Sequence, residues 1–509
     1  MVLPLSDRLT RHCCSPGRCF SFGAAGSIAN RDAVNGAIAP LAVRGVLPVA
    51  VLVAVAQFAA AIADKGYWFD EVYMLAIGRK HLDWGSADQP PLAPALARLM
   101  DAIAPGSILA LRAPAILASA AAVLVAALIA RELGGGRRAQ VFTAGAQATG
   151  IWTTLAGHWL TPYTLEPVQW LTLLWLLIRW IRLRDDRLLL ACGVVAGMAA
   201  MTKFQVLLLC VVLLVTVAAL GPRDLLQRRL LWAGFAVCAL ISAPTLAWQS
   251  AHGWPQLKMT TVVGSEADAL YGGRLGIAVG LIIFAGVAAT VLMTYGLYCL
   301  LRAEELRQYR FLSATFVILY VMFVATEGRP YYLAGLYAPL AAAGAVSLQH
   351  RRESDGACWR WVVWPVYALS VAVAVGMLVV GAAITRSQVP EQIAQRTAAT
   401  YHALPEPLRA HTVVMGQSYI LAAYIDDLSG KYDLPNAYSS NRSYGYFPPP
   451  PPDKDAMLYI GTNPDRIRPN FRDAIKVGEV QGDINAWLLT GRLEPWDTIY
   501  PRLRTLTVT

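Results

Sequence analysis

Two adjacent carboxylates, Asp70 and Glu71, follow closely on an uncharged run at residues 45–63. Aromatic residues surround the pair within residues 67–73, YWFDEVY. Partial burial raises the pKa of a carboxylate and makes it a better base, so this pair is a candidate for accepting the proton of a hydroxyl group. A solvated pair of loop acids is the alternative, which the aromatic neighbours disfavour.

A third carboxylate, Asp88, precedes Gln89 and two prolines in the segment ADQPPLAP, residues 87–94. The prolines fix the backbone and push Gln89 toward an extended conformation. A stiff turn at this place would hold Asp88 near Asp70. An equally weighted alternative makes Asp88 the N-cap of a helix whose first turn contains the prolines.

Two cations stand at the ends of apolar runs, Lys203 in MAAMTKFQ and Arg329 in TEGRPYYL. Long cationic side chains near helix ends commonly extend to the membrane interface for solvation alone. A phosphate group held at membrane depth, however, needs positive donors at about this height. Both residues are therefore candidate phosphate ligands, weighed evenly against the solvation alternative.

The elements that position these residues are predicted to be membrane helices. The chain has 509 residues, of which 56% are hydrophobic and 15% charged, whereas soluble domains have about 25% charged residues. The net charge of +10 is scattered between apolar runs and indicates no nucleic-acid partner. Because a span needs about 20 apolar residues, the sequence predicts eleven spans, near 42–63, 107–130, 139–157, 162–181, 188–203, 204–220, 230–249, 275–301, 311–326, 331–348 and 361–385.

The short loops rich in Lys and Arg predict which side of the membrane each segment occupies. Residues 1–40 are expected to be a disordered cytoplasmic tail, 41–385 a transmembrane catalytic domain with a first external loop at 64–106, and 386–509 an external domain. The unusual polar residues then fall on the outer side. They include the candidates for binding sugar or acceptor: Asp88, Gln89, His158, Glu166, His252, Tyr331 and Tyr332.

The C-terminal region changes in composition and is expected to form a small α/β domain. Its predicted strands are TVVMG (412–416), AMLYIG (456–461) and AWLLTGRL (486–493), with a helix at 418–430 and an extended proline run at 448–452. No Walker loop or glycine-rich nucleotide fingerprint is present, so a cytoplasmic nucleotide substrate is unsupported.

Several segments together resemble the bacterial members of glycosyltransferase family 39, which is similar to protein O-mannosyltransferases and to the aminoarabinose transferase that modifies lipid A. They occur in the same order: FDEVYML, DQPPLAPALARL, LRAPAILAS, VVAGMAAMTKFQVLLL, SAPTLAWQSAHGWP and GRPYYLAGLYAPLAAAGA. The resemblance covers roughly residues 45–350 and implies a GT-C fold. It also implies a sugar donor linked to a polyprenyl phosphate and used at the outer face of the cytoplasmic membrane.

The resemblance matches Asp70 to the family's catalytic Asp and departs from the family at two places. Gln89 stands where the family usually has His before the prolines, and Tyr163 stands where a second Asp commonly follows Thr-Pro. Glu166, one helical turn later, is a possible substitute for that Asp. A divalent cation is possible and its ligands are unknown.

We therefore expect an inverting glycosyltransferase of the cytoplasmic membrane. Asp70 would act as the base with Glu71 beside it, and Lys203 and Arg329 would hold the donor phosphate. The acceptor would be a protein, a glycolipid or a polysaccharide. The alternatives are a transporter or flippase of envelope precursors and a non-catalytic subunit of an envelope assembly complex, but no internal repeat or midplane acid supports transport.

Overall fold

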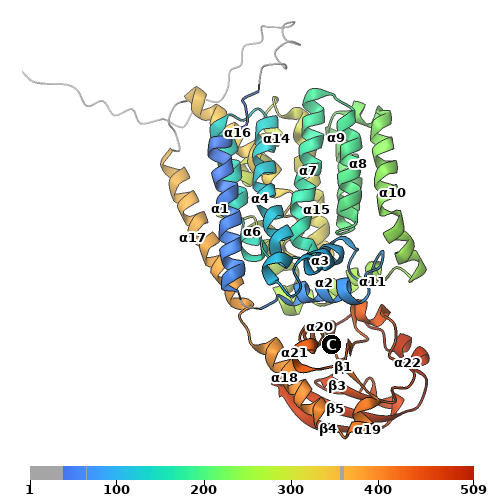
Figure 1. Cartoon of the computed structure of the whole chain (residues 1–509). Helices are drawn as coiled ribbons and strands as arrows, with labels where there is room; N and C mark the ends of the chain where they lie inside the picture. Colours follow the sequence, from blue (N-terminus) through green and yellow to red (C-terminus); the bar gives the residue numbers. More distant parts are fainter. Residues whose placement is uncertain (1–37, 65, 356–359, 509) are drawn as a thin grey trace, which may run out of the picture. The chain divides into compact units, whose positions relative to one another are not determined.

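A computed structural model describes residues 38–64, 66–355 and 360–508 (Figure 1). The expected N-terminal tail, residues 1–40, lies almost entirely outside the described residues. Within them, the apolar part of the chain is helical, because backbone polar groups in hydrocarbon must be bonded inside the segment. Its helices are α1 (Val43–Ala63), α4 (Ile108–Glu132), α5 (Arg137–Ala148), α6 (Ile151–Ala156), α7 (Pro162–Leu183), α8 (Arg187–Ala200), α9 (Gln205–Leu220), α10 (Arg229–Ala251), α13 (Gly273–Ile283), α14 (Val287–Arg302), α15 (Arg310–Ala325), α16 (Tyr337–Asp355) and α17 (Arg360–Ile384).

Shorter helices lie in the connections between these long ones. The predicted first external loop forms α2 (Phe69–Lys80) and α3 (Leu92–Ile103), and the connection after α10 forms α11 (Pro255–Ser265) and α12 (Ala267–Tyr271). Short 3-10 turns η2 (Arg223–Gln227) and η3 (Arg307–Tyr309) lie in two further connections.

Five of the described helical segments are long and apolar enough to cross a membrane: α1, α4, α10, Arg307–Ala325 and Trp361–His402. The pair α13 and α14 adds a sixth if a span bent by 91° is counted. The other predicted spans correspond to helices that are shorter, interrupted or more charged, namely α5 with α6, α7, α8, α9 and α16. The multi-pass helical architecture is as expected, whereas the number eleven stays a prediction.

Two interrupted helices meet at their breaks. Gly286 separates α13 from α14 and has a left-handed φ of 84°. A Cβ atom at this glycine would lie 2.6 Å from the carbonyl oxygen of Thr149, which ends α5. The amide of Trp152 in α6 donates to the carbonyl oxygen of Phe284 at 3.3 Å. Only glycine fits the first of these positions, so the break is built into the sequence.

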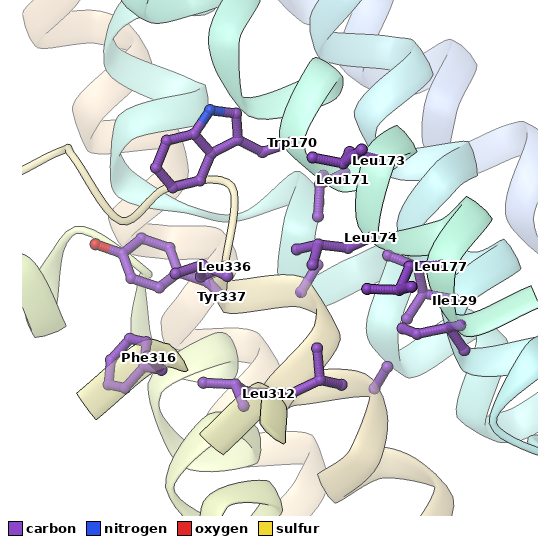
Figure 2. Packing of buried hydrophobic residues seen from close by; sticks show 14 of the residues in the cluster. Ile129, Trp170, Leu171, Leu173, Leu174, Leu177, Leu312, Phe316, Leu336 and Tyr337 are labelled. Carbon is purple, nitrogen blue, oxygen red and sulfur yellow. The ribbon is translucent and has the colours of Figure 1, made fainter. Parts of the chain in front are cut away.

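The helical core is formed by large apolar side chains between closely packed helices. Figure 2 shows Trp170, Leu171 and Leu174 of α7 in the same cluster as Leu312 and Phe316 of α15. Elsewhere in the core, small residues let two backbones approach each other closely.

The clearest case of close approach is between α14 and α16. A Cβ atom on Gly296 would lie 1.9 Å from the carbonyl oxygen of Leu340, and one on Gly344 would lie 2.0 Å from that of Leu292. Any larger residue at either glycine would therefore force these helices apart.

The C-terminal part forms a five-stranded sheet in the order β2-β1-β3-β5-β4. β1 pairs in parallel with β2 and β3, and β5 pairs antiparallel with β3 and β4. The strands are β1 (Thr412–Gly416), β2 (Ala437–Tyr438), β3 (Ala456–Gly461), β4 (Phe471–Gln481) and β5 (Ile484–Arg492). The accompanying helices are α18 (Val389–His402), α19 (Glu406–Ala410), α20 (Tyr419–Asp427), α21 (Ser429–Tyr432), α22 (Trp496–Arg502) and the 3-10 turns η4 (Arg442–Tyr446) and η5 (Arg468–Asn470).

The three predicted strands are confirmed as β1, β3 and β5, but β2 and β4 were not predicted. β4 has mostly exposed or half-buried positions and two irregularities in its pairing with β5. It therefore lacks the clean alternation that marks a strand. The predicted helix at 418–430 begins as expected, with the Ser418 hydroxyl accepting from the amide of Leu421 at 3.3 Å, but Leu428 divides it into α20 and α21.

The sheet domain is attached to α2 through charged pairs. Arg79 bonds Asp101 of α3 at 2.6 Å and Asp427 of α20 at 3.2 Å. Lys80 pairs with Asp426, whose second oxygen accepts from Tyr444 at 2.6 Å. α2 is therefore held between the membrane helices and the sheet domain, and any side chain on it is positioned by both.

Candidate active site

Helix α2 carries Asp70 and Glu71 in its first turn. The amide of Trp68, just before the helix, donates to Glu71 Oε2 at 3.0 Å and fixes the helix start. Successive side chains on an α-helix point about 100° apart. The two neighbouring carboxylates therefore leave α2 in different directions.

Glu71 is fully buried and paired with Arg112 of α4. Arg112 Nη2 lies 2.6 Å from Glu71 Oε2, and Arg112 Nε lies 2.9 Å from Oε1. The amide of Leu160 also donates to Oε1, at 3.1 Å. Both carboxylate oxygens thus have strong partners, which tie α2 to α4 and to the segment before α7.

Asp64 and His158 extend this arrangement. Arg112 Nη1 lies 2.7 Å from Asp64 Oδ2, and His158 Nε2 lies 3.7 Å from the same oxygen. His158 Nδ1 is hydrogen-bonded to Gln57 Oε1 at 2.8 Å. We call Asp64, Glu71, Arg112 and His158 the buried network, since all four are buried. His158, a predicted sugar or acceptor ligand, lies in it.

Asp70 is half-buried and bonded to two tyrosines from different parts of the chain. Tyr163 Oη of α7 donates to Oδ2 at 3.1 Å, and Tyr419 Oη of α20 donates to Oδ1 at 3.4 Å. Burial raises the pKa of Asp70 to about 6; the nearby Arg442 charge and the tyrosine hydroxyls oppose this rise, and the Asp88 charge adds to it. Asp70 is thus ionised at neutral pH but more basic than an ordinary aspartate.

Asp88 turns toward the same place. Its Oδ1 accepts from Tyr73 Oη at 2.7 Å and from Ser443 Oγ at 2.9 Å, and its Oδ2 lies 3.5 Å from Arg442 Nη1. The N-cap of α3 is Pro91, and no side chain caps that helix. The N-cap interpretation of Asp88 is therefore wrong, because this carboxylate is committed to contacts with α2 and the sheet domain.

Gln89 and His252 lie beside the turn that carries Asp88. The carbonyl oxygen of Gln89 accepts from the Ser86 amide at 3.1 Å, and Gln249 Nε2 donates to the Ser86 carbonyl at 2.9 Å, which holds the turn to α10. His252 is exposed just after α10, with Nδ1 2.8 Å from the carbonyl oxygen of Trp248 and its ring stacked on that indole at 3.9 Å. The structure does not bring His252 to Asp70.

Lys203, Glu166, Tyr331 and Tyr332 form one group. Lys203 Nζ lies 3.3 Å from Glu166 Oε2, and it stands 4.1 Å from the ring centroid of Tyr332 and 5.3 Å from that of Tyr331. The rings of Tyr331 and Tyr163 are 5.2 Å apart. Tyr163 also donates a hydrogen bond to Asp70. The four predicted residues of this group are therefore connected to Asp70 through Tyr163.

Arg329 reaches the site from the segment before α16. It is only 9% exposed, and its Nη2 lies 2.5 Å from Glu266 Oε2. Glu266 Oε1 in turn lies 3.4 Å from Arg442 Nη2. A chain of alternating charges therefore connects Arg329 through Glu266 and Arg442 to Asp88.

Sequence reasoning missed four residues of this group: Tyr163 as a hydrogen-bond donor, Glu266, Tyr419 and Arg442. Arg442 begins η4 and has a φ of 47°, a left-handed conformation that is uncommon outside glycine. It faces Asp88, Glu266 and the Tyr419 hydroxyl. A lone arginine inside the aromatic segment NRSYGY was the available signal.

We call the complete set the Asp70 site, which comprises Asp70, Asp88, Tyr163, Glu166, Lys203, Glu266, Arg329, Tyr331, Tyr332, Tyr419 and Arg442. Across residues 38–64, 66–355 and 360–508, no group of three or more His, Cys, Asp or Glu side chains is arranged to hold a metal ion.

The chain is similar to known proteins in sequence over one segment and in fold over most of its length. The family model described as dolichyl-phosphate-mannose-protein mannosyltransferase matches residues 88–248, a segment that includes Asp88, Glu166 and Lys203. No curated protein matches the sequence.

Two solved structures of ArnT from Cupriavidus metallidurans share the fold over nearly the whole chain. The apo state has a TM-score of 0.61 and 14% identity, covering 92% of this chain and 100% of that one. The state bound to undecaprenyl phosphate has a TM-score of 0.59 and 14% identity, covering 88% and 98%. As the sequence resemblance predicted, the chain therefore has the fold of the GT-C glycosyltransferases.

Proposed function

We propose that this protein transfers a sugar from a polyprenyl-phosphate donor to an acceptor hydroxyl at the outer face of the cytoplasmic membrane. The observation that carries the proposal is the Asp70 site itself. It combines Asp70, whose pKa is raised, with Lys203, Arg329 and Arg442. A base beside cations is what displacement of a phosphate by a hydroxyl requires.

Asp70 is the proposed base. The acceptor oxygen attacks the anomeric carbon and gives its proton to the Asp70 carboxylate, while the bond from that carbon to the phosphate oxygen breaks. The polyprenyl phosphate leaves with the bonding electrons, and the configuration at the anomeric carbon inverts. A pKa of about 6 leaves Asp70 free to accept a proton at neutral pH.

Lys203 and Arg329 are proposed to stabilise the charge that develops on the departing phosphate. Each is paired with a carboxylate in the structure, Glu166 and Glu266 respectively. A partly buried cation placed where negative charge grows stabilises the transition state without reorganising solvent.

The proposed roles of the other predicted residues follow from their positions. Asp88, Glu166, Tyr331 and Tyr332 line the site and are proposed to contact the sugar or the acceptor. Gln89 orients the turn that carries Asp88 through its backbone. We give three remaining candidates different roles: Glu71 and His158 position α2 through the buried network, and His252 lies outside the Asp70 site.

The donor class is supported by one finding outside this chain. ArnT, which shares the fold, has been solved with undecaprenyl phosphate bound. Lys203, Arg329 and Arg442 provide the positive charge and the N–H donors that bind a phosphate headgroup.

Envelope glycan analysis tests the function directly. A deletion strain complemented with the intact chain is compared with one complemented with Asp70→Asn, which keeps the shape of the side chain. We expect the same sugar to disappear from the same glycan in the deletion strain and in the Asp70→Asn strain. Loss in the deletion strain with full restoration by Asp70→Asn would contradict a transferase and favour a transporter or a scaffold.

A further inference from the structure

Two arginines from distant parts of the chain share one carboxylate. Glu266 Oε2 lies 2.5 Å from Arg329 Nη2, and Glu266 Oε1 lies 3.4 Å from Arg442 Nη2. The side chains of Arg329 and Arg442 are 11% and 12% exposed, and that of Glu266 is 20% exposed. Glu266 thus neutralises a nearly buried pair of cations that would otherwise repel each other.

The Glu266 carboxylate does not provide a hydrogen-bond acceptor for every N–H donor of the two arginines. Arg329 Nη1 is buried and has no hydrogen-bond partner among the described residues. A guanidinium has five N–H donors, and leaving a buried donor without a partner is unfavourable. A phosphate has more acceptor oxygens than a carboxylate and binds guanidinium groups in the same bidentate manner.

Glu266 is carried by a segment whose ends have hinge-like backbone conformations. It links α11 to α12, and the segment is preceded by Gly253 and Trp254 with φ values of 74° and 56°. Gly272 and Gly273, with φ values of 73° and 66°, follow it. Left-handed residues at both ends allow the segment to turn away with changes at few dihedral angles.

The arginine pair lies beside the proposed base. Arg442 Nη1 is 3.3 Å from Tyr419 Oη, which itself donates to Asp70. Asp88 Oδ2 lies 3.5 Å from the same Nη1. An anion bound by Arg442 and Arg329 would therefore place the group attached to it next to Asp70.

We propose that Arg329 and Arg442 bind the phosphate of the donor and that Glu266 occupies this subsite until the donor displaces it. The inference rests on the function proposed above and adds Arg442 and Glu266 to it. Before the donor arrives, the carboxylate compensates the two cations. As the bond to the anomeric carbon breaks, the phosphate gains negative charge, so the arginine pair holds it more strongly than it held the donor.

The test measures binding of undecaprenyl phosphate to the purified full-length protein in nanodiscs, without any sugar. We expect Glu266→Gln to tighten binding by about fivefold, because the competing charge is gone. Arg442→Gln is expected to weaken binding by about tenfold. With Arg442→Gln already present, Glu266→Gln should tighten binding by less than about twofold, since the two residues act on one subsite.

Glu327→Gln is the matched control. It removes one negative charge two residues from Arg329, but Glu327 pairs with Arg274 at 2.8 Å, and the Arg274 side chain is 69% exposed. We expect a change of less than about twofold. Equal tightening by Glu327→Gln and Glu266→Gln would overturn the inference, because it would show a general charge effect.

Two further arms keep the inference testable. Should Glu266→Gln unfold, Glu266→Asp retains the charge but shortens its reach, and about twofold tightening is expected. Inorganic phosphate should compete with the lipid more effectively in Glu266→Gln than in the unmodified protein, and a complete lack of competition in both would overturn the phosphate subsite. Unchanged or weaker lipid binding by a folded Glu266→Gln protein would also overturn it.

These outcomes are distinct from failure of the proposed function. If the variants bind undecaprenyl phosphate as expected but deletion of the gene changes no glycan, the proposed transferase activity is wrong. The proposed phosphate subsite is then still supported. If Asp70→Asn loses one sugar but Glu266→Gln leaves lipid binding unchanged, the transferase proposal is supported and the phosphate subsite is wrong.

Discussion

Asp70 and Glu71 are adjacent in the sequence but belong to two different regions of the molecule. Glu71 lies in the buried network, with Arg112 contacts of 2.6 and 2.9 Å on its two oxygens. Asp70 faces the sheet domain, and it accepts two longer hydrogen bonds from neutral tyrosines, at 3.1 and 3.4 Å. The Glu71 carboxylate is paired with a cation through both oxygens, whereas the Asp70 carboxylate is held by tyrosine hydroxyls without a direct ion pair.

This difference supports the proposal that Glu71 is a positioning acid and Asp70 a reactive one. A carboxylate in a bidentate pair with a buried arginine is fixed and has little capacity to accept another proton. A carboxylate that is desolvated and bonded only to hydroxyl groups keeps that capacity. The pairing around each acid therefore supports the proposed roles, with Asp70 as the base and Glu71 as a positioning residue.

The largest expected effect comes from the reactive acid. Asp70→Asn should lower kcat/KM for sugar transfer by about a thousandfold, which corresponds to about 4 kcal/mol, because the base is lost. Steady-state assays with the purified protein measure this effect, and thermal unfolding confirms that the variant is folded. Full activity in a folded Asp70→Asn protein would contradict the assignment.

Removing the cation of the buried network should mainly affect folding. Arg112→Met leaves the carboxylates of Asp64 and Glu71 buried without their partner and should lower the free energy of unfolding by about 3 kcal/mol. Chemical or thermal denaturation in detergent measures the loss. Arg310→Met is the control, since its partner Glu304 is 73% exposed, and a loss of equal size there would refute the special role of Arg112.

The matched change at the positioning acid should be smaller. Glu71→Gln keeps one hydrogen-bond acceptor for Arg112 but loses the charge, so we expect about 1.5 kcal/mol of lost stability. Activity should fall by less than tenfold, because the acid does not contact the reacting atoms. A thousandfold loss of kcat in a stable Glu71→Gln protein would erase the distinction between the two acids.

The smallest expected effect is a pH dependence specific to Asp70. Its pKa is about 6 in the folded protein, above the ordinary aspartate value of 3.8, so the folded state binds the proton more tightly. Stability from this group is present below about pH 4 and is lost as pH rises to about 6.

Asp70→Asn removes this dependence. Relative to the unmodified protein, the variant should gain about 1 kcal/mol between pH 4 and 7, a value reduced because the carboxylate is partly exposed. Unfolding temperatures of both proteins across this range, with Glu304→Gln as baseline, measure the gain. A constant difference across the range would contradict the raised pKa.

Local patterns predicted much of the fold. Apolar runs predicted the positions of the long helices, and short apolar segments predicted β1, β3 and β5. The span boundary in the continuous apolar sequence around Lys203 is confirmed by the turn between α8 and α9. The edge strand β4 was missed because its exposed positions lack a period of two, and the two-residue β2 is too short to show one.

The sequence predicted site residues only in the part of the chain that forms the membrane helices and their connections, before the sheet domain. Asp70, Asp88 and Lys203 carry local signals, namely aromatic neighbours, prolines and the end of an apolar run. Arg442 and Tyr419 enter the site through docking of the sheet domain onto α2, which depends on charge pairs between residues more than 300 positions apart. No pattern within a short window encodes such a contact.

Because the chain is made from its N-terminus, the residues that the sheet domain adds to the Asp70 site are made long after Asp70. Asp70 is synthesised early, but Tyr419 and Arg442, which complete its surroundings, come more than 300 residues later. A chain arrested or cleaved before β1 could insert its helices and would still lack both residues. The proposed sugar transfer would then require a chain made at least as far as Arg442, because only such a chain can complete the surroundings of Asp70.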